Sequence, residues 1–217
     1  AWHGGVITGD IATPGTLTLN GVLSQTGTTT VYLRNGTQLV HTNASGASRI
    51  ANASGSGVNI EQGAIFRNTG SLTIDTPNAG SITYIDHDSG AAGRFENTGT
   101  LTKVGDGRVD FGNFGQLQLV QQGSLVISEG LVTLGNAVTL GGTLDIAADS
   151  TLRVLAGTTT IAAGTEVTGA GALDLAGGVL TLDNGVDIAA HQIISGGTLT
   201  VATGSSATFG NTLTWTG

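Results

Sequence analysis

The strongest candidate for chemistry in this chain is the tripeptide Asp86-His87-Asp88, which lies in a Gly- and Ser-rich stretch close to Tyr84. A polysaccharide lyase or hydrolase needs clustered carboxylates for acid–base work or for Ca²⁺, commonly with a cation that stabilises developing charge. The nearest cations along the chain are Arg94, Lys103 and Arg108. One polar tripeptide is more typical of an exposed loop than of an active site, so we predict no catalytic residues and keep polysaccharide cleavage as an alternative.

Other potential ligand residues do not form a metal site in the sequence. The stretch VGDGRVDFG, from Val104 to Gly112, partly resembles Gly/Asp nonapeptides that bind Ca²⁺, but those occur in adjacent repeats and this stretch occurs once. His3, His41 and His191 are isolated along the chain, and cysteine is absent. We therefore predict no metal, no cofactor and no disulfide.

Charge limits the partners of the protein. The net charge is -8, and residues 109–217 hold only one basic side chain, Arg153. Nucleic acids and anionic membranes require a basic surface, and no apolar run approaches the ~20 residues of a membrane span. We expect neither a nucleic-acid partner nor membrane insertion.

The elements that position these residues are short strands. The chain has 37 glycines, 39% hydrophobic residues and only 10% charged residues, a mixture that suits many strands joined by tight turns. From Leu117 onward, apolar pairs such as Leu125/Ile127 and Val132/Leu134 recur with Gly, Asn or Asp between them. Such strands are too short to cross a sandwich or a barrel. About three of them make a turn of roughly 20 residues, which predicts an all-β fold: a single parallel β-helix, or β-solenoid, with right-handed crossovers.

We predict one continuous unit over residues 1–217, with a looser part at 1–109 and a regular part at 110–217. The segments Thr42 to Gly57 and Asp75 to Gly93 are rich in Ser, Gly and Asn, so they are expected to form longer loops on one side of the coil. The unit is expected to be one repeat, or an excerpt, of a larger array or filament.

A Phe-x-Asn motif occurs four times. The pairs are Phe66/Asn68, Phe95/Asn97, Phe111/Asn113 and Phe209/Asn211. We expect each Phe to fill the core at a corner and the Asn side chains to form a hydrogen-bonded ladder along the stack.

Threonines flank an inward leucine at several places. The segments are Thr16-Leu17-Thr18, Thr100-Leu101-Thr102, Thr198-Leu199-Thr200 and Thr212-Leu213-Thr214. A flat outward array of threonines could order water and bind ice. Asp145, Arg153 and Asp174 stand at equivalent positions elsewhere and would interrupt such a face, so we interpret the threonines as β-branched strand residues.

The two ends of the chain match each other. Trp2 and Gly4 at the start recur as Trp215 and Gly217 at the end, and the chain contains no other tryptophan. We interpret Trp2, Gly4, Trp215 and Gly217 as the junction between successive units, with Trp215 beginning the next copy.

Several phrases resemble a known class of proteins. F-x-N-T-G-[ST]-L, the opening W-x-G-G-x-I-x-G and the recurrent G-[TS]-L-x-[LIV] strands are similar to those of the very large, repetitive β-helical surface and secreted proteins of bacteria. Autotransporter passengers and filamentous-haemagglutinin-like adhesins are the best known proteins with sequence patterns of this kind. The resemblance implies an elongated stalk, adhesin or matrix fibre outside the cell or on its surface, without assigning a binding residue.

We therefore expect a non-catalytic extracellular structural protein that forms a fibre or stalk by end-to-end stacking, with copies of itself or adjacent repeats as partners. One alternative is an adhesin that binds glycans or a cell surface through loops 42–57 and 75–93. The other is the polysaccharide lyase or hydrolase with the Asp86-His87-Asp88 loop as its active site.

Overall fold

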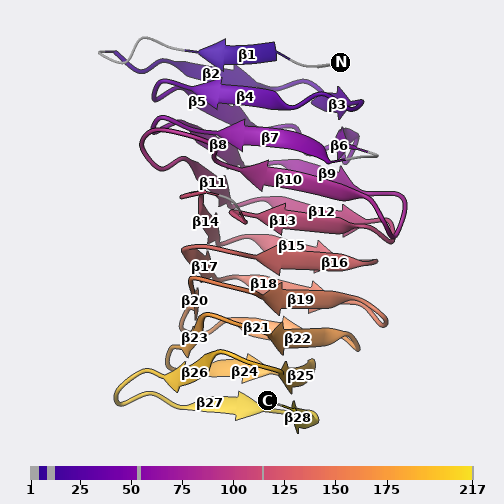
Figure 1. Cartoon of the computed structure of the whole chain (residues 1–217), viewed down its shortest axis with the longest axis vertical. Helices are drawn as coiled ribbons and strands as arrows, with labels where there is room; N and C mark the ends of the chain where they lie inside the picture. Colours follow the sequence, from indigo (N-terminus) through magenta and orange to yellow (C-terminus); the bar gives the residue numbers. More distant parts are fainter. Residues whose placement is uncertain (1–4, 9–12, 53–54, 114, 217) are drawn as a thin grey trace.

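The computed structural model describes residues 5–8, 13–52, 55–113 and 115–216. These residues form strands and no helix, and the strands wind into a parallel β-solenoid of about nine turns with about three strands per turn (Figure 1). Every pairing between named strands is parallel, and each strand pairs with the strand one turn away. The all-β parallel solenoid predicted from the sequence is confirmed.

Three sheets run along the axis of the coil. The first sheet contains β1 (Gly5–Thr8), β4 (Val31–Arg34), β7 (Ser56–Ile60), β10 (Ile82–Asp86), β13 (Arg108–Phe111), β16 (Leu131–Leu134), β19 (Thr151–Val154), β22 (Ala172–Leu175), β25 (His191–Ile194) and β28 (Leu213–Trp215). The second sheet contains β2 (Thr16–Leu19), β5 (Gln38–His41), β8 (Ile65–Asn68), β11 (Arg94–Asn97), β14 (Gln118–Gln121), β17 (Val138–Leu140), β20 (Thr158–Ile161), β23 (Val179–Leu182) and β26 (Thr198–Val201). The third sheet contains β3 (Ser24–Thr26), β6 (Ser48–Ala51), β9 (Ser71–Asp75), β12 (Thr100–Val104), β15 (Ser124–Ile127), β18 (Thr143–Ile146), β21 (Glu166–Thr168), β24 (Val186–Ile188) and β27 (Ala207–Phe209).

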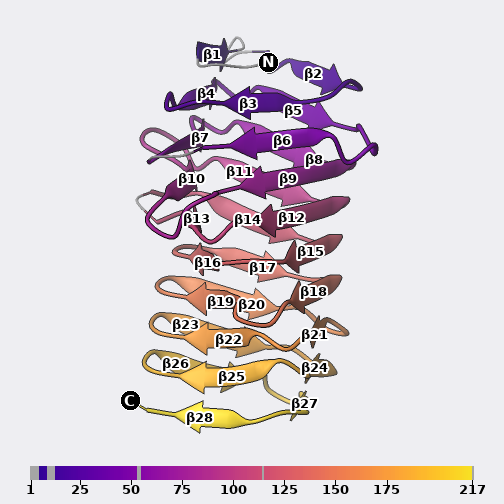
Figure 2. The ribbon, with the colours of Figure 1, turned by 90° about the vertical axis from the view of Figure 1, so that its right-hand side faces the viewer.

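The coil is right-handed. In Figure 1 the upper strands of the first sheet run to the left on the near side, and the chain then passes behind them and descends. Figure 2 shows that the third sheet leads the chain back to the side that faces the viewer in Figure 1. The whole stack twists along its length. This is the hand that the right-handed twist of strands favours for parallel crossovers.

Alternation within each strand builds the core. In β4, Val31 and Leu33 are fully buried, whereas Tyr32 and Arg34 point outward. Because the sheets are in register, the inward residues of one turn lie on those of the next, and a single apolar core runs through the coil.

The two segments expected to be long loops each contain a strand. Residues 42–57 include β6 and the start of β7, and residues 75–93 include β10. Each segment therefore combines a strand with loop residues, and the strands bury apolar side chains such as Ile50 and Ile85.

Apolar side chains are exposed mainly at the two ends of the coil. Seven large hydrophobic residues are exposed in the described part of the chain: Val6, Leu17, Val22, Leu155, Val201, Leu213 and Trp215. The first three lie in the first turn and the last three in the last turns, so only Leu155 lies between.

Candidate functional site

The tripeptide Asp86-His87-Asp88 lies at the end of β10, on the first sheet. Asp86 and His87 are buried and only Asp88 is exposed. The interpretation of an ordinary exposed loop was therefore wrong for two of the three residues, because this segment packs against the neighbouring turns.

Both ring nitrogens of His87 are engaged with the backbone. The Gln116 N–H donates to Nδ1 at 3.2 Å, and Nε2 lies 3.0 Å from the Ala91 carbonyl oxygen. A backbone N–H only donates and a carbonyl only accepts, so in this arrangement Nδ1 accepts a hydrogen bond and Nε2 donates one. His87 thus ties the segment after β10 to the next turn of the coil.

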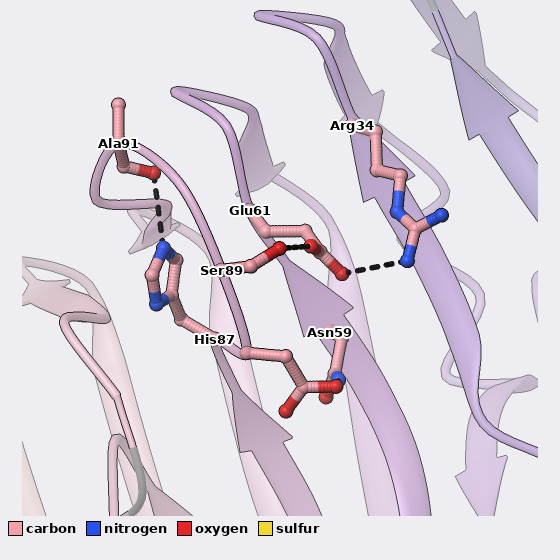
Figure 3. Close-up of polar contacts among 7 residues, drawn as sticks. Arg34, Asn59, Glu61, His87, Ser89 and Ala91 are labelled. Atoms are coloured by element: carbon pink, nitrogen blue, oxygen red, sulfur yellow. Dashed lines mark hydrogen bonds and ion pairs between the residues drawn. The ribbon is translucent and has the colours of Figure 1, made fainter.

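A second set of polar contacts holds the same segment to the preceding turns (Figure 3). The fully buried carboxylate of Glu61 accepts hydrogen bonds from Ser89 Oγ at 2.7 Å and from the Arg34 guanidinium at 3.2 Å. The amide nitrogen of Asn59 donates to Asp88. Side chains from three successive turns therefore fix the residues that follow β10.

A hollow opens on the outer face of the first sheet beside this segment. It has a volume of about 210 Å³ and is lined by Thr30, Tyr32, Gly55, Asn59, Tyr84, Asp86 and Asp88. Tyr32, Asn59 and Asp86 stand in register in one column, and Tyr84 pairs with Gly57 in the next. The two tyrosines therefore come from neighbouring columns, on strands two turns apart.

The Tyr32 side of this hollow is held in place. The Arg34 guanidinium carbon lies 4.3 Å from the centre of the Tyr32 ring, and the same guanidinium is paired with Glu61. A ring fixed in this way loses little conformational freedom when a ligand binds.

The structure does not bring the three nearest cations to the tripeptide. Arg94 pairs with Glu96 at 2.7 Å and Arg108 pairs with Asp110 at 2.8 Å. Lys103 points into the core, and no cation lines the hollow among the residues described. The hollow thus combines two carboxylates, an amide and two aromatic rings, which suits a neutral, hydroxyl-rich ligand.

Lys103 is a buried cation, and its burial was not predicted from the sequence. Its Nζ donates to the backbone carbonyls of Val104, Gly105 and Glu129 at 3.0, 2.5 and 3.1 Å. Burial lowers the pKa of Lys103 to about 8, although the nearby carboxylates of Glu129 and Asp106 partly oppose this shift. The signal was present in TLTKV, where Lys103 has the same parity as the inward Leu101.

In the segment from Val104 to Gly112, the carboxyl of Asp110 is buried and paired with Arg108. Burial raises the pKa of the Asp110 carboxyl, while Arg108, Thr133 and Asn113 lower it. No group of three or more His, Cys, Asp or Glu side chains in the described residues could hold a metal ion. Only residues 105–107 of this segment form the turn, because Val104 ends β12 and Arg108–Phe111 form β13, so the interpretation of the whole segment as a plain turn was wrong.

The polar ladder exists, but with a different membership. Asn68 donates to Asn97 at 2.6 Å, and Asn97 donates to Gln121 at 2.8 Å. At the other end of the ladder, His41 Nδ1 lies 2.7 Å from Asn68 Oδ1. All four side chains are buried in the second sheet, so they form one continuous chain of hydrogen bonds inside the core.

Two of the four Phe-x-Asn motifs lie outside this ladder. The rings of Phe66 and Phe95 stack with their centres 5.1 Å apart. Phe111 belongs to β13 of the first sheet and meets Phe95 edge-on at 5.6 Å, and Phe209 belongs to β27 of the third sheet. Asn113 and Asn211 follow those strands, so the prediction that all four motifs share one corner was wrong.

The expected junction is described at one end only. Trp215 lies in β28 and is 70% exposed. Trp2, Gly4 and Gly217, as well as His3, lie outside the described residues. The equivalence of Trp2 and Trp215 stays a prediction.

Comparison of the chain with protein-family models, with curated proteins and with solved structures found no match. The class that the structure defines is the parallel β-solenoid, with repeats of one turn. In the described residues, no helix is long and apolar enough to cross a membrane.

Proposed function

We propose that this chain is a non-catalytic structural segment of an extracellular or cell-surface fibre or stalk, extended by further β-solenoid turns at its ends. In this role it would resemble the repetitive β-helical surface and secreted proteins of bacteria, such as autotransporter passengers and filamentous-haemagglutinin-like adhesins. The single observation that carries the proposal is the concentration of exposed apolar side chains in the first and last turns.

The ends also present unpaired strand edges. β1, β2 and β3 begin the three sheets and β26, β27 and β28 end them, so each of these strands has one neighbour among the strands that the structure describes. At the first end, a hollow of about 310 Å³ is lined by Ile7, Leu17, Leu19, Val22, Leu23, Ser24 and Leu39. Open edges above an apolar core favour pairing with further strands. Copies of this chain and adjacent repeats of one longer chain both supply such strands.

Electron microscopy of the native material tests this proposal. About nine turns at ~4.8 Å per turn give a unit about 43 Å long. Thin fibres with an axial repeat near this length are expected. Discrete particles of one unit, at concentrations where the ends can meet, would contradict the proposal.

A second candidate function is glycan binding, and the hollow beside β10 favours it. The hollow contains both tyrosines of the chain together with Asn59, Asp86 and Asp88. The C–H face of a pyranose ring packs well on an aromatic ring, and carboxylates and amides bind its hydroxyl groups. The alternative drawn from the sequence was an adhesin that binds through loops 42–57 and 75–93. Of these two segments, only Gly55, Tyr84, Asp86 and Asp88 line the hollow. The acidic lining favours neutral sugars over uronic acids.

A glycan array with neutral oligosaccharides and matched uronic-acid oligosaccharides tests this second function. Neutral glycans should bind, and Tyr84→Ala should weaken binding by about 10-fold or more while Tyr84→Phe largely keeps it. Asp88→Asn should also weaken binding, and Asp187→Asn on β24, which does not line the hollow, is its control. Assaying the same glycans for newly formed chain ends tests the alternative that the protein cleaves polysaccharides. The structure does not favour this alternative, because both ring nitrogens of His87 are hydrogen-bonded to the backbone.

A further inference from the structure

Threonines form a regular array on the outer face of the second sheet. One column, in register over four successive strands from β17 to β26, is Thr139, Thr160, Thr181 and Thr200. The adjacent column over β20, β23 and β26 is Thr158, Val179 and Thr198. Figure 1 shows β17, β20 and β23 stacked above one another along one edge of the coil.

The residues that seemed to interrupt such an array lie elsewhere. Asp145 is in β18 of the third sheet, and Arg153 and Asp174 are in β19 and β22 of the first sheet. Neither of the two columns contains a charged residue in this part of the second sheet. The objection to a continuous threonine face, drawn from the sequence, is therefore removed.

The hydroxyl groups of this array are available to solvent. Thr139, Thr158, Thr198 and Thr200 are exposed, and Thr160 and Thr181 are half-buried. None of these six side chains hydrogen-bonds to another residue in the described part of the chain, in contrast to Thr165 and Thr168 near by. Their hydroxyl groups therefore hydrogen-bond to solvent and are free to bind a partner at the surface.

The backbone fixes the spacing of these hydroxyl groups. Neighbours along the axis are about 4.8 Å apart, and alternate residues along a strand are about 6.6 Å apart. Threonine is stiff at χ1 because it is β-branched, so the array is ordered before any partner arrives. Each residue presents one hydroxyl, which donates and accepts, and one methyl group.

We propose that this face binds ice. The surface of an ice crystal is a rigid two-dimensional lattice of hydrogen-bond donors and acceptors, with repeats of a few ångströms that are comparable to these two spacings. A rigid array of hydroxyl and methyl groups can hold water in that lattice, whereas long charged side chains would disorder it. A protein partner is a poorer match, because the face lacks the large aromatic and Arg side chains typical of protein interfaces.

Inhibition of ice recrystallisation by the purified full chain tests the proposal. The wild-type chain should keep ice grains small at micromolar concentrations, and the double variant Thr160→Lys/Thr181→Lys should lose at least 10-fold in potency. Thr102→Lys is the matched control, because Thr102 points outward from β12 of the third sheet. Its potency should equal that of the wild type.

A second variant covers the case in which the double variant fails to fold. Thr200→Lys changes an exposed residue of the last strand of the second sheet, where a lysine is easily accommodated. Circular dichroism establishes that each variant is folded, and partial loss of potency is expected. Lack of inhibition by the wild-type chain, or equal potency of folded Thr200→Lys and wild type, would overturn the proposal. Either result would leave the proposal of a structural fibre unaffected. Three of the four strands that carry the array, β17, β20 and β23, lie inside the coil, and only β26 is a terminal strand.

Discussion

At the scale of single residues, the inward column that contains Asn97 changes its chemistry along the coil. It runs through His41, Asn68, Asn97 and Gln121, and continues in register as Leu140, Ile161 and Leu182. The polar part depends on the hydrogen bonds between its members, because a buried amide that loses its partner has lost its hydration without gaining a replacement hydrogen bond. The apolar part shows that the same position accepts leucine when its neighbours are apolar.

Replacing Asn97 alone by Leu should therefore destabilise the protein by about 2–4 kcal/mol, since Asn68 and Gln121 lose a partner. Replacing His41, Asn68, Asn97 and Gln121 together by Leu should recover most of that loss. Urea unfolding followed by circular dichroism measures both effects. Equal or greater destabilisation in the fourfold variant would contradict this account of the ladder.

Lys103 predicts a pH dependence of stability. Its pKa is lowered by burial from 10.5 to about 8, so between these values the unfolded chain holds a proton that the folded chain has lost. Stability contributed by this residue therefore rises with pH in that window and is smallest below about pH 8. Thermal unfolding from pH 7.5 to 9.5 should show a rising melting temperature that is reduced in Lys103→Met. Parallel curves for the two proteins would show that Lys103 does not titrate in this window.

At the scale of elements, Gly57 allows β7 and β10 to pair. A Cβ atom at this position would lie 1.7 Å from the Tyr84 carbonyl oxygen, which is part of the backbone and cannot move aside. Gly57→Ala should force the strands apart and cost on the order of 3 kcal/mol or more. Gly21→Ala is the control, because a Cβ there meets no atom within 4 Å. Thermal unfolding of the two variants should differ clearly, and similar melting temperatures would show that β10 can shift without loss.

At the scale of the whole molecule, the number of strands determines how units can stack. The first and last strands, β1 and β28, both belong to the first sheet, so the chain comprises nine turns of three strands and one strand more. If copies of this chain stack end to end, as proposed, a join without a gap would place β1 on β26, β2 on β27 and β3 on β28. Successive units in such a fibre would then be rotated by about one third of a turn, in addition to the twist of the coil. Image reconstruction of the fibres measures this rotation.

The exposed apolar residues at the ends should drive this stacking. Leu213→Asp should shorten the fibres or abolish them, because it places a charge at the junction. Leu155→Asp is a matched control, since Leu155 is 42% exposed and Leu213 is 43% exposed, but Leu155 lies in mid-coil. Sedimentation velocity and electron microscopy give the length distributions. Similar distributions for the two variants would rule out a junction at β28.

The sequence by itself determined the class of fold. Alternating apolar residues in very short runs, separated by Gly, Asn and Asp, exclude helices and long strands and leave a coil as the means of burying every inward side chain. It also singled out Asp86-His87-Asp88 and the Asn68–Asn97 part of the ladder. These predictions depend only on local period and residue type.

Only the tertiary structure decided which residues share a face. Successive members of the polar ladder lie one turn apart and are separated by 27, 29 and 24 positions in the sequence. Arg153 and Asp174 also lie one turn apart, but only 21 positions separate them. Because the length of a turn varies, a motif can fall on any of the three sheets, as Phe111 and Phe209 do. The threonine array, and the absence of Asp145 from it, follow from register between turns, which is set by hydrogen bonds and core packing along the axis and not by local sequence.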